Sequence, residues 1–307
     1  MESIFIISPS GAILPEYIDG AVQRLQAWGY NVTLSPHARG EYGRFSGTDE
    51  ERLADINEAL QDSSIDTILC SRGGYGLQRI LDKVDLSPLT INHSPLLIGF
   101  SDITALHQLY TLHTTHYTLH GLMCKHIATL PEDSVALQLF RRALAREPLS
   151  YTLPAHPLNR NGQAQGTLIG GNLSVLYGLQ GTPYDLNHVI DAHPEGVILF
   201  IEDISERHYH IDRMMNNLRM SGVLSRIKGL LVGQFTDCEP DPLMMTSNVQ
   251  WPMSNGIYAT IREAVEDYTY PVLYDFPAGH VEDNRPLYLN HPTTLTCAED
   301  SAQLLQP

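Results

Sequence analysis

The first part of the chain alternates short apolar runs with segments of helical periodicity. The run from Ile4 to Ile7 predicts a strand, and the apolar positions from Tyr17 to Trp28 recur at helical spacing. A second extended run covers Asn31 to Leu34. This order of strand, helix and strand is typical of βαβ units, in which helices join the strands of a parallel sheet.

The same alternation continues through residue 146. Thr48 and Glu51 have the spacing of a capping box, which predicts a helix over 49–61. Further strands are predicted at 67–70 and 96–100, and further helices through Leu106, Leu109 and Leu112 and over 133–146. The pattern favours a doubly wound α/β domain with a largely parallel sheet.

The stretch EPLSYTLPAHPLNRNGQAQG breaks this pattern, because it is rich in Pro, Gly and Asn and has no helical period. A chain of 307 residues also exceeds what one ordinary core serves, so we expect two domains, 1–150 and 166–307. Residues 151–165 are then a linker or crossover strands. The second half mixes predicted helices at 172–179, 210–221 and 256–267 with predicted strands at 196–201, 228–232, 272–274 and 287–289.

Composition and charge indicate which kinds of binding partner to expect. With 43% hydrophobic and 18% charged residues, the chain has the composition of a folded globular protein. Nineteen Lys and Arg against 35 Asp and Glu give a net charge of −16, which repels phosphate backbones and anionic membrane surfaces. We therefore expect no nucleic-acid partner. The N-terminal sequence lacks a basic, apolar leader and no run is long enough to span a bilayer, so we expect a cytoplasmic protein without membrane contact.

The cysteines and histidines give weak signals. The four Cys residues are scattered and form no CxxC pair, which favours reduced, buried thiols over a disulfide framework. Two His pairs have spacings that metal sites use, His116 with His120 and His208 with His210. Because no HExxH motif or Cys/His cluster accompanies them, we expect no metal and no cofactor.

Two segments of the first half suit nucleophilic chemistry. The motif GFSDIT places Ser101 where a buried strand meets a helix, which exposes the hydroxyl to the helix N-terminus. The motif RGGYG at 72–76 follows the preceding strand and offers N–H groups unobstructed by Cβ atoms, which suits an anion or a developing oxyanion. The simpler alternatives are that Ser101 or Asp102 only caps a helix and that RGGYG only forms a tight turn.

The second half supplies an acid and a base. Glu202 follows the apolar strand GVILFI and could orient a histidine, with Glu206 as the alternative acid. His280 lies in the loop sequence FPAGH, which gives an imidazole the reach to meet a serine from another domain. Arg213, on the following helix, could bind a carboxylate or belong to a solvated helix face.

Taken together, RGGYG, GFSDIT, GGNL at 170–173 and LFIEDISE with AGH resemble the signature of the LD-carboxypeptidase family of serine peptidases. The resemblance runs from ISPSG at 7–11 to AGH at 278–280. It implies a flavodoxin-like, doubly wound N-terminal domain joined to a β-rich α/β C-terminal domain, often as a homodimer.

The resemblance also implies roles for individual residues. Ser101 is the implied nucleophile, His280 its base and Glu202 the acid that orients the base. Backbone N–H groups of Asp102 and of the RGGYG glycines, of which we favour Gly74, would hold the oxyanion. The implied substrate is a muropeptide, L-Ala-D-Glu-meso-diaminopimelate-D-Ala, cleaved before its terminal D-alanine in peptidoglycan recycling. We expect Arg72, Asn172 and Arg213 to bind its carboxylate.

Three other functions stay open on the sequence. A related branch of the family cleaves the aminoacyl-nucleotide microcin C and confers self-immunity. A non-catalytic α/β module would instead use RGGYG to bind a small anionic ligand, with Ser101 as a helix cap. A thiol hydrolase would use Cys70, although a Cys inside a predicted strand is more typical of a buried apolar position.

Overall fold

The chain folds into two compact units. The computed structural model describes residues 2–89, 94–238 and 256–307. Unit 1 comprises Met1–Glu147 and Glu282–Asn290, and unit 2 comprises Pro148–Val281 and His291–Pro307. The chain therefore passes from unit 1 to unit 2, returns to unit 1 for one short segment and ends in unit 2. Residues 151–165, expected as a linker or crossover strands, lie within unit 2 and include parts of two strands of its sheet.

Unit 1 is built on a six-stranded sheet in the order β11-β5-β4-β3-β1-β2. Its strands are β1 (Ser3–Ile7), β2 (Asn31–Leu34), β3 (Thr67–Cys70), β4 (Leu96–Gly99), β5 (Thr118–His120) and β11 (Leu287–Leu289). β1 to β5 are parallel, and β11 joins β5 in the antiparallel sense. The order β2-β1-β3-β4-β5 is that of flavodoxin-like doubly wound sheets, which confirms the predicted fold class of this part.

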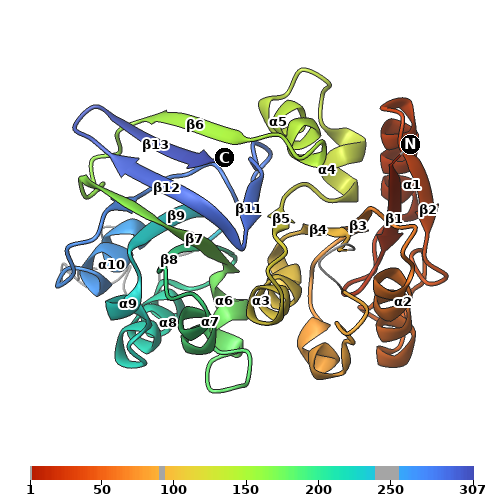
Figure 1. Ribbon diagram of the computed structural model, residues 1–307, viewed down its shortest axis with the longest axis horizontal. Helices are drawn as coiled ribbons and strands as arrows, with labels where there is room; N and C mark the ends of the chain where they lie inside the picture. Colours follow the sequence, from red (N-terminus) through yellow and green to blue (C-terminus); the bar gives the residue numbers. More distant parts are fainter. Residues whose placement is uncertain (1, 90–93, 239–255) are drawn as a thin grey trace, which may run out of the picture. The chain divides into compact units, whose positions relative to one another are not determined.

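Helices cover both faces of this sheet (Figure 1). They are α1 (Pro15–Ala27), α2 (Asp49–Gln61), α3 (Thr104–His113), α4 (Cys124–Thr129) and α5 (Val135–Leu144). α1 packs against α4 on one face, while α2 and α3 lie on the other. The capping box that starts α2 is present, because the Glu51 N–H donates to Thr48 Oγ1 and the Thr48 N–H donates to Glu51 Oε2.

Unit 2 contains a seven-stranded mixed sheet in the order β10-β9-β8-β7-β12-β13-β6. Its strands are β6 (Leu149–Pro154), β7 (Gly162–Asn172), β8 (Val197–Ile204), β9 (Gly229–Thr236), β10 (Val272–Leu273), β12 (His291–Cys297) and β13 (Ser301–Gln306). The neighbours β10, β9, β8 and β7 are parallel, whereas β7, β12, β13 and β6 pair antiparallel. The expected β-rich α/β character of the second half is confirmed.

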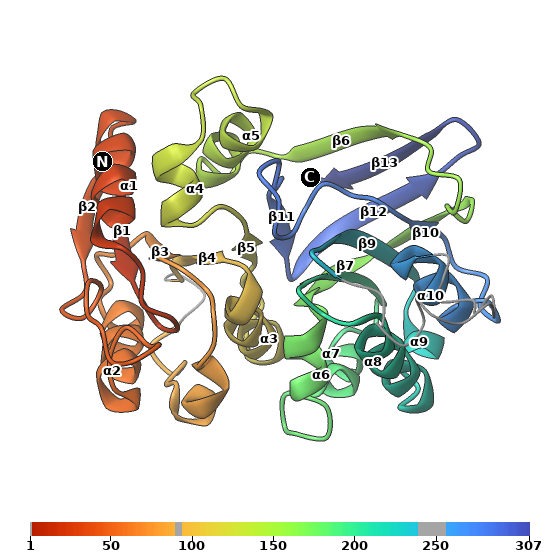
Figure 2. The same cartoon turned by 180° about the vertical axis from the view of Figure 1, so that it is seen from behind.

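Five helices accompany this sheet within the described residues. They are α6 (Leu173–Gly178), α7 (Leu186–Ala192), α8 (His208–Met220), α9 (Val223–Arg226) and α10 (Ile257–Ala264). Figure 2 shows α6 to α9 gathered on one side of the parallel strands. Across residues 2–89, 94–238 and 256–307, no helix is both long and apolar enough to cross a membrane.

Three of the parallel strands, β3 and β4 of unit 1 and β8 of unit 2, have the burial that central parallel strands require. All four residues of β3 and all four of β4 are buried, and β8 is buried from Val197 to Asp203. These continuous apolar runs made the strands visible in the sequence. β12 and β13 instead alternate buried positions with more accessible ones, and their mixture of Thr, Gln and Leu contains no continuous apolar run that would predict a strand.

Candidate active site

Ser101 stands on a sharp turn between β4 and the helical segment that follows. A 3₁₀ turn over Ser101–Ile103 continues directly into α3. Ser101 has a φ of 66°, in the left-handed region that non-glycine residues rarely adopt because the Cβ crowds the backbone. A serine held in this conformation at a strand-to-helix turn has the geometry of a nucleophile elbow. This conformation is not needed for a simple N-cap, whose φ and ψ lie in the extended region.

The RGGYG loop packs directly against this serine. A Cβ atom at Gly73 would lie 2.7 Å from the Ser101 Cβ and 3.0 Å from its Oγ, so no other residue fits there without displacing the serine. The neighbouring Gly74 has a φ of 112°, which glycine adopts at little cost. The packing role of Gly73 was not expected from the sequence, although the doubled glycine was a signal that a close backbone approach was needed.

The two candidate oxyanion donors lie on segments next to Ser101. Asp102 occupies the second position of the 3₁₀ turn, where N–H groups have no partner within the helix itself. Gly73 gives its carbonyl to the Gly11 N–H at 3.1 Å, which fixes the orientation of the peptide that carries the Gly74 N–H. Gly74 and Asp102 remain predictions as oxyanion donors.

Glu202 and His280 form a hydrogen-bonded pair in unit 2. Glu202 Oε2 lies 2.8 Å from His280 Nδ1, although 78 residues separate them. The Glu202 side chain is fully buried, and 16% of the His280 side chain is exposed. A shift in the β8–β9 register occurs opposite Glu202, where β9 carries one residue more than β8 between matched positions. Such bulges redirect side chains at the edges of functional sites.

Close backbone packing brings the His280 loop to Glu202. A Cβ at Gly233 of β9 would meet the Ala278 carbonyl oxygen at 2.5 Å, and one at Gly279 would meet Glu202 Oε2 at 3.0 Å. Gln234 holds the same loop by three hydrogen bonds: its N–H donates to Ala278, and its side-chain amide donates to Phe276 and to Asp275. Gln234 carried no signal in the sequence that pointed to this role.

The hydrogen bond decides which tautomer of His280 is favoured. With Nδ1–H bonded to the carboxylate, the neutral imidazole carries its basic lone pair on Nε2. Burial lowers the pKa of His280, but the hydrogen bond that it donates to Glu202 and the charges of Glu202 and Asp203 outweigh it, so the net pKa is raised above its ordinary value. Burial, reinforced by the charge of Glu202, raises the pKa of the adjacent Asp203 to about 7.

The two candidate acids have different partners. Glu206 precedes α8, and its Oε2 lies 2.8 Å from Nδ1 of His210 in the first turn of that helix; both side chains are partly exposed. Glu202, not Glu206, contacts His280. This geometry distinguishes the two carboxylates that the sequence left as alternatives.

The three candidate carboxylate-binding residues lie in different settings. Arg72, the first residue of RGGYG, is exposed and donates to the Ala12 carbonyl at 2.6 Å. Arg213 is exposed on α8 and lies over the Tyr209 ring at 5.5 Å. Asn172 is buried and caps α6, since its Oδ1 accepts from the Val175 N–H. Its side-chain amide also donates to Asp203. Their substrate contacts remain predictions.

The alternative thiol nucleophile is placed unfavourably. Cys70 is completely buried in β3, and burial raises the pKa of its thiol far above the ordinary value. A buried neutral thiol is a poor nucleophile. Within the parts of the chain that the structure describes, no three His, Cys, Asp or Glu side chains form a group that could hold a metal ion.

Ser101 and its neighbours belong to unit 1, and the Glu202–His280 pair belongs to unit 2. The LD-carboxypeptidase N-terminal domain model matches residues 4–121, and the LD-carboxypeptidase C-terminal domain model matches residues 165–295. A probable murein peptide carboxypeptidase of Bacillus subtilis is 32% identical over 308 aligned positions, which cover 98% of this chain and 91% of that protein. The chain belongs to the LD-carboxypeptidase family, a family of serine hydrolases.

Other relatives agree with this assignment. The murein tetrapeptide carboxypeptidase of Pseudomonas aeruginosa is 28% identical, over 92% of this chain and 89% of its own. The crystal structure of a muramoyltetrapeptide carboxypeptidase from Oxalobacter formigenes superposes with a TM-score of 0.82 at 28% identity, covering 99% of this chain and 98% of that one. The microcin C7 self immunity protein MccF shares the fold, with a TM-score of 0.82 at 22% identity over 100% of this chain and 96% of its own.

Proposed function

We propose that this protein is a serine LD-carboxypeptidase that removes the terminal D-alanine from murein tetrapeptides, with Ser101, His280 and Glu202 as a catalytic triad. The observation that carries the proposal is the 2.8 Å contact between Glu202 and His280. Two residues far apart in sequence, each chosen for a triad role, form the acid–base contact that a serine nucleophile requires.

In this mechanism, His280 Nε2 takes the proton of the Ser101 hydroxyl while Oγ attacks the carbonyl carbon of the LD peptide bond. The N–H groups of Gly74 and Asp102 stabilise the negative charge that forms on the carbonyl oxygen. His280 then gives its proton to the amine of the departing D-alanine. Glu202 holds the imidazole in the required tautomer and stabilises the imidazolium.

The second half of the reaction restores the serine. A water molecule enters after D-alanine has left, and His280 removes its proton as it attacks the acyl-enzyme. The tetrahedral intermediate collapses, the tripeptide carboxylate leaves and Ser101 regains its proton from His280. Arg72, exposed at the start of RGGYG, is the favoured ligand for the carboxylate of the terminal D-alanine, because a guanidinium binds carboxylates with two parallel hydrogen bonds.

The test is release of D-alanine from L-Ala-D-Glu-meso-diaminopimelyl-D-Ala by the wild type and by Ser101→Ala, both with EDTA. We expect release by the wild type and a loss of about 10⁶-fold in kcat for the variant, as for other serine triads. Equal release by both proteins would exclude Ser101 as nucleophile. No release by folded wild type, with hydrolysis of an aminoacyl nucleotide instead, would favour the self-immunity type of substrate.

A further inference from the structure

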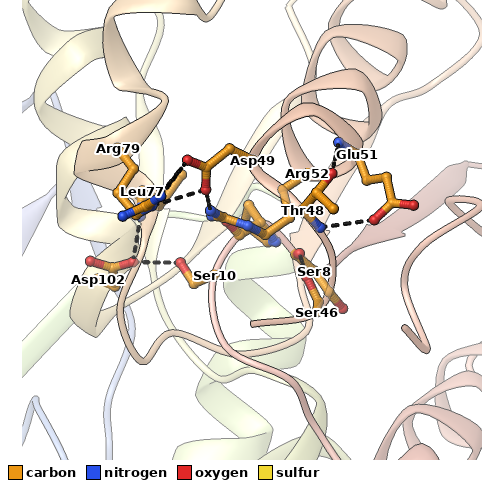
Figure 3. A network of polar contacts seen from close by, with 11 residues as sticks. Ser8, Ser10, Ser46, Thr48, Asp49, Glu51, Arg52, Leu77, Arg79 and Asp102 are labelled. Atoms are coloured by element: carbon orange, nitrogen blue, oxygen red, sulfur yellow. Dashed lines mark hydrogen bonds and ion pairs between the residues drawn. The ribbon is translucent and has the colours of Figure 1, made fainter. Parts of the chain in front are cut away.

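The loops that follow β1, β3 and β4 are joined by a buried polar network in unit 1 (Figure 3). The order of the sheet reverses between β1 and β3, and ligands bind at the carboxyl ends of strands beside such a point. The loop after β4 carries Ser101, and the loop after β3 carries RGGYG. Whatever fixes these loops to one another also fixes the nucleophile relative to its oxyanion donors.

The Asp102 carboxylate is at the centre of this network. One of its oxygens, Oδ2, accepts the Ser10 hydroxyl at 2.6 Å and the Leu77 N–H at 3.0 Å. Ser10 lies in the loop after β1, and Leu77 directly follows RGGYG. Asp102 is 4% exposed, so these bonds form in a setting where hydrogen bonds to a charged group are strong. One carboxylate thus joins three loops.

A buried arginine supports the same loops from α2. Arg52 has no exposed surface and donates to the Pro9 carbonyl, the residue before Ser10, at 2.7 Å. A Cβ on Gly76 would lie 2.9 Å from the same guanidinium. Asp49 accepts a hydrogen bond from Arg52 and pairs with Arg79 just beyond RGGYG, as Figure 3 shows. The RGGYG loop is therefore anchored at its C-terminal end by α2 as well as by Asp102.

We propose that the Asp102 side chain is a positioning residue, which holds the RGGYG loop and the loop after β1 at the distance from Ser101 that oxyanion stabilisation requires. Its side chain touches neither substrate nor reacting atoms and acts through the backbone of its neighbours. This inference rests on the proposed function. It gives the Asp102 side chain a role separate from that of the Asp102 N–H, which is the proposed oxyanion donor. The backbone of Gly73 is already in contact with Ser101, so a small shift of the loop alters the geometry around the nucleophile.

The kinetic test compares Asp102→Ala, Asp102→Asn and Ser10→Ala on the tetrapeptide. We expect Asp102→Ala to lower kcat by about 100-fold with KM within about twofold, because oxyanion donors act in the transition state. Asp102→Asn should recover most of that loss, since both hydrogen bonds go to one oxygen that an amide can also provide. Ser10→Ala should lower kcat by about 10-fold. A rise in KM at unchanged kcat, or wild-type kcat in folded Asp102→Ala, would overturn the proposal.

Ser35→Ala is the matched control. Ser35 also donates at 2.6 Å to a buried carboxylate of unit 1, that of Asp55, which lies on α2. Its loss removes a bond of the same kind outside the three loops. We expect Ser35→Ala to retain wild-type kcat; a loss equal to that of Ser10→Ala would show that any weakened bond in unit 1 has the same effect, and would overturn the proposal.

Hydrogen–deuterium exchange provides a readout that needs no turnover. In Asp102→Ala, amides of residues 71–77 should exchange at least about 10-fold faster than in wild type and in Ser35→Ala, because the opening free energy of that segment falls. Unchanged exchange in this segment would refute the positioning role even if the enzyme were active. If wild type released no D-alanine while exchange rose as expected, the proposed substrate would fail and the positioning role would stand.

Discussion

The candidate nucleophile in unit 1 and the candidate acid–base pair in unit 2 are built by different means. Around Ser101, unit 1 relies on the backbone: a left-handed φ at the serine, glycines without room for a Cβ, and N–H groups at the start of a helix. Around Glu202, unit 2 joins two side chains, one from β8 and one from a loop 78 residues later, and close backbone packing and hydrogen bonds from Gln234 hold that loop in place. The nucleophile is therefore set by local geometry, while the base depends on a long-range contact and on the charge that it carries.

The largest effect should come from removing that charge. Glu202→Gln keeps the shape of the side chain but loses the carboxylate, and we expect kcat to fall about 10⁴-fold, as when other triads lose their orienting acid. Glu206→Gln is the control, because the Glu206–His210 pair is partly exposed; its kcat should stay within about threefold. Steady-state kinetics on the tetrapeptide measure both, and equal losses would contradict the assignment of Glu202.

A smaller loss of kcat should follow from crowding the backbone next to Ser101 in unit 1. Gly73→Ala places a methyl group 2.7 Å from the Ser101 Cβ, so the loop or the serine must move, and kcat should fall about 10²- to 10³-fold. Gly20→Ala makes a similarly short contact, 2.8 Å, with Ala128 between α1 and α4. Kinetics and melting temperatures of both variants separate the effects: a kcat loss in Gly20→Ala would show that crowding anywhere in unit 1 suffices.

The pH dependence of activity should report how the charge of Glu202 sets the pKa of His280. His280 must be neutral to accept a proton, so activity rises with pH through its pKa, which lies above the ordinary value of 6.5. The acid limb of kcat/KM in wild type should therefore lie above pH 6.5. In Glu202→Gln the charge of the carboxylate is gone, while burial still lowers the pKa of His280. The acid limb of kcat/KM should therefore move to lower pH. A limb that stays in place would contradict the role of Glu202 in setting it.

The smallest effect should come from Cys70. Since this thiol is fully buried with a raised pKa, native protein should resist iodoacetamide, and Cys70→Ala should keep kcat within about twofold. The variant should lose about 1 kcal/mol of unfolding free energy, as an average core substitution does. Inactivation of native wild type that is absent in Cys70→Ala would revive the thiol alternative.

Much of unit 1 could be predicted because its signals are local. The capping box of α2 and the four-residue apolar runs of β3 and β4 specify elements through neighbouring residues. The strands of unit 2 were harder to predict. β12 and β13 pair antiparallel with alternating exposure, and their mixture of Thr, Gln and Leu is like that of surface segments. The return of β11 from the far end of the chain to β5 had no local signal either.

The sequence by itself determined the order of the first strands and helices, the turn on which Ser101 stands and, through the family's motifs, which acid and base to consider. Tertiary structure decided that Glu202 rather than Glu206 meets His280, that Gly73 packs against the serine, and that Asp102 joins three loops through its side chain. The physical reason is that periodicity and capping act between neighbours in the chain, whereas hydrogen bonds and steric contacts act between atoms that only folding brings together.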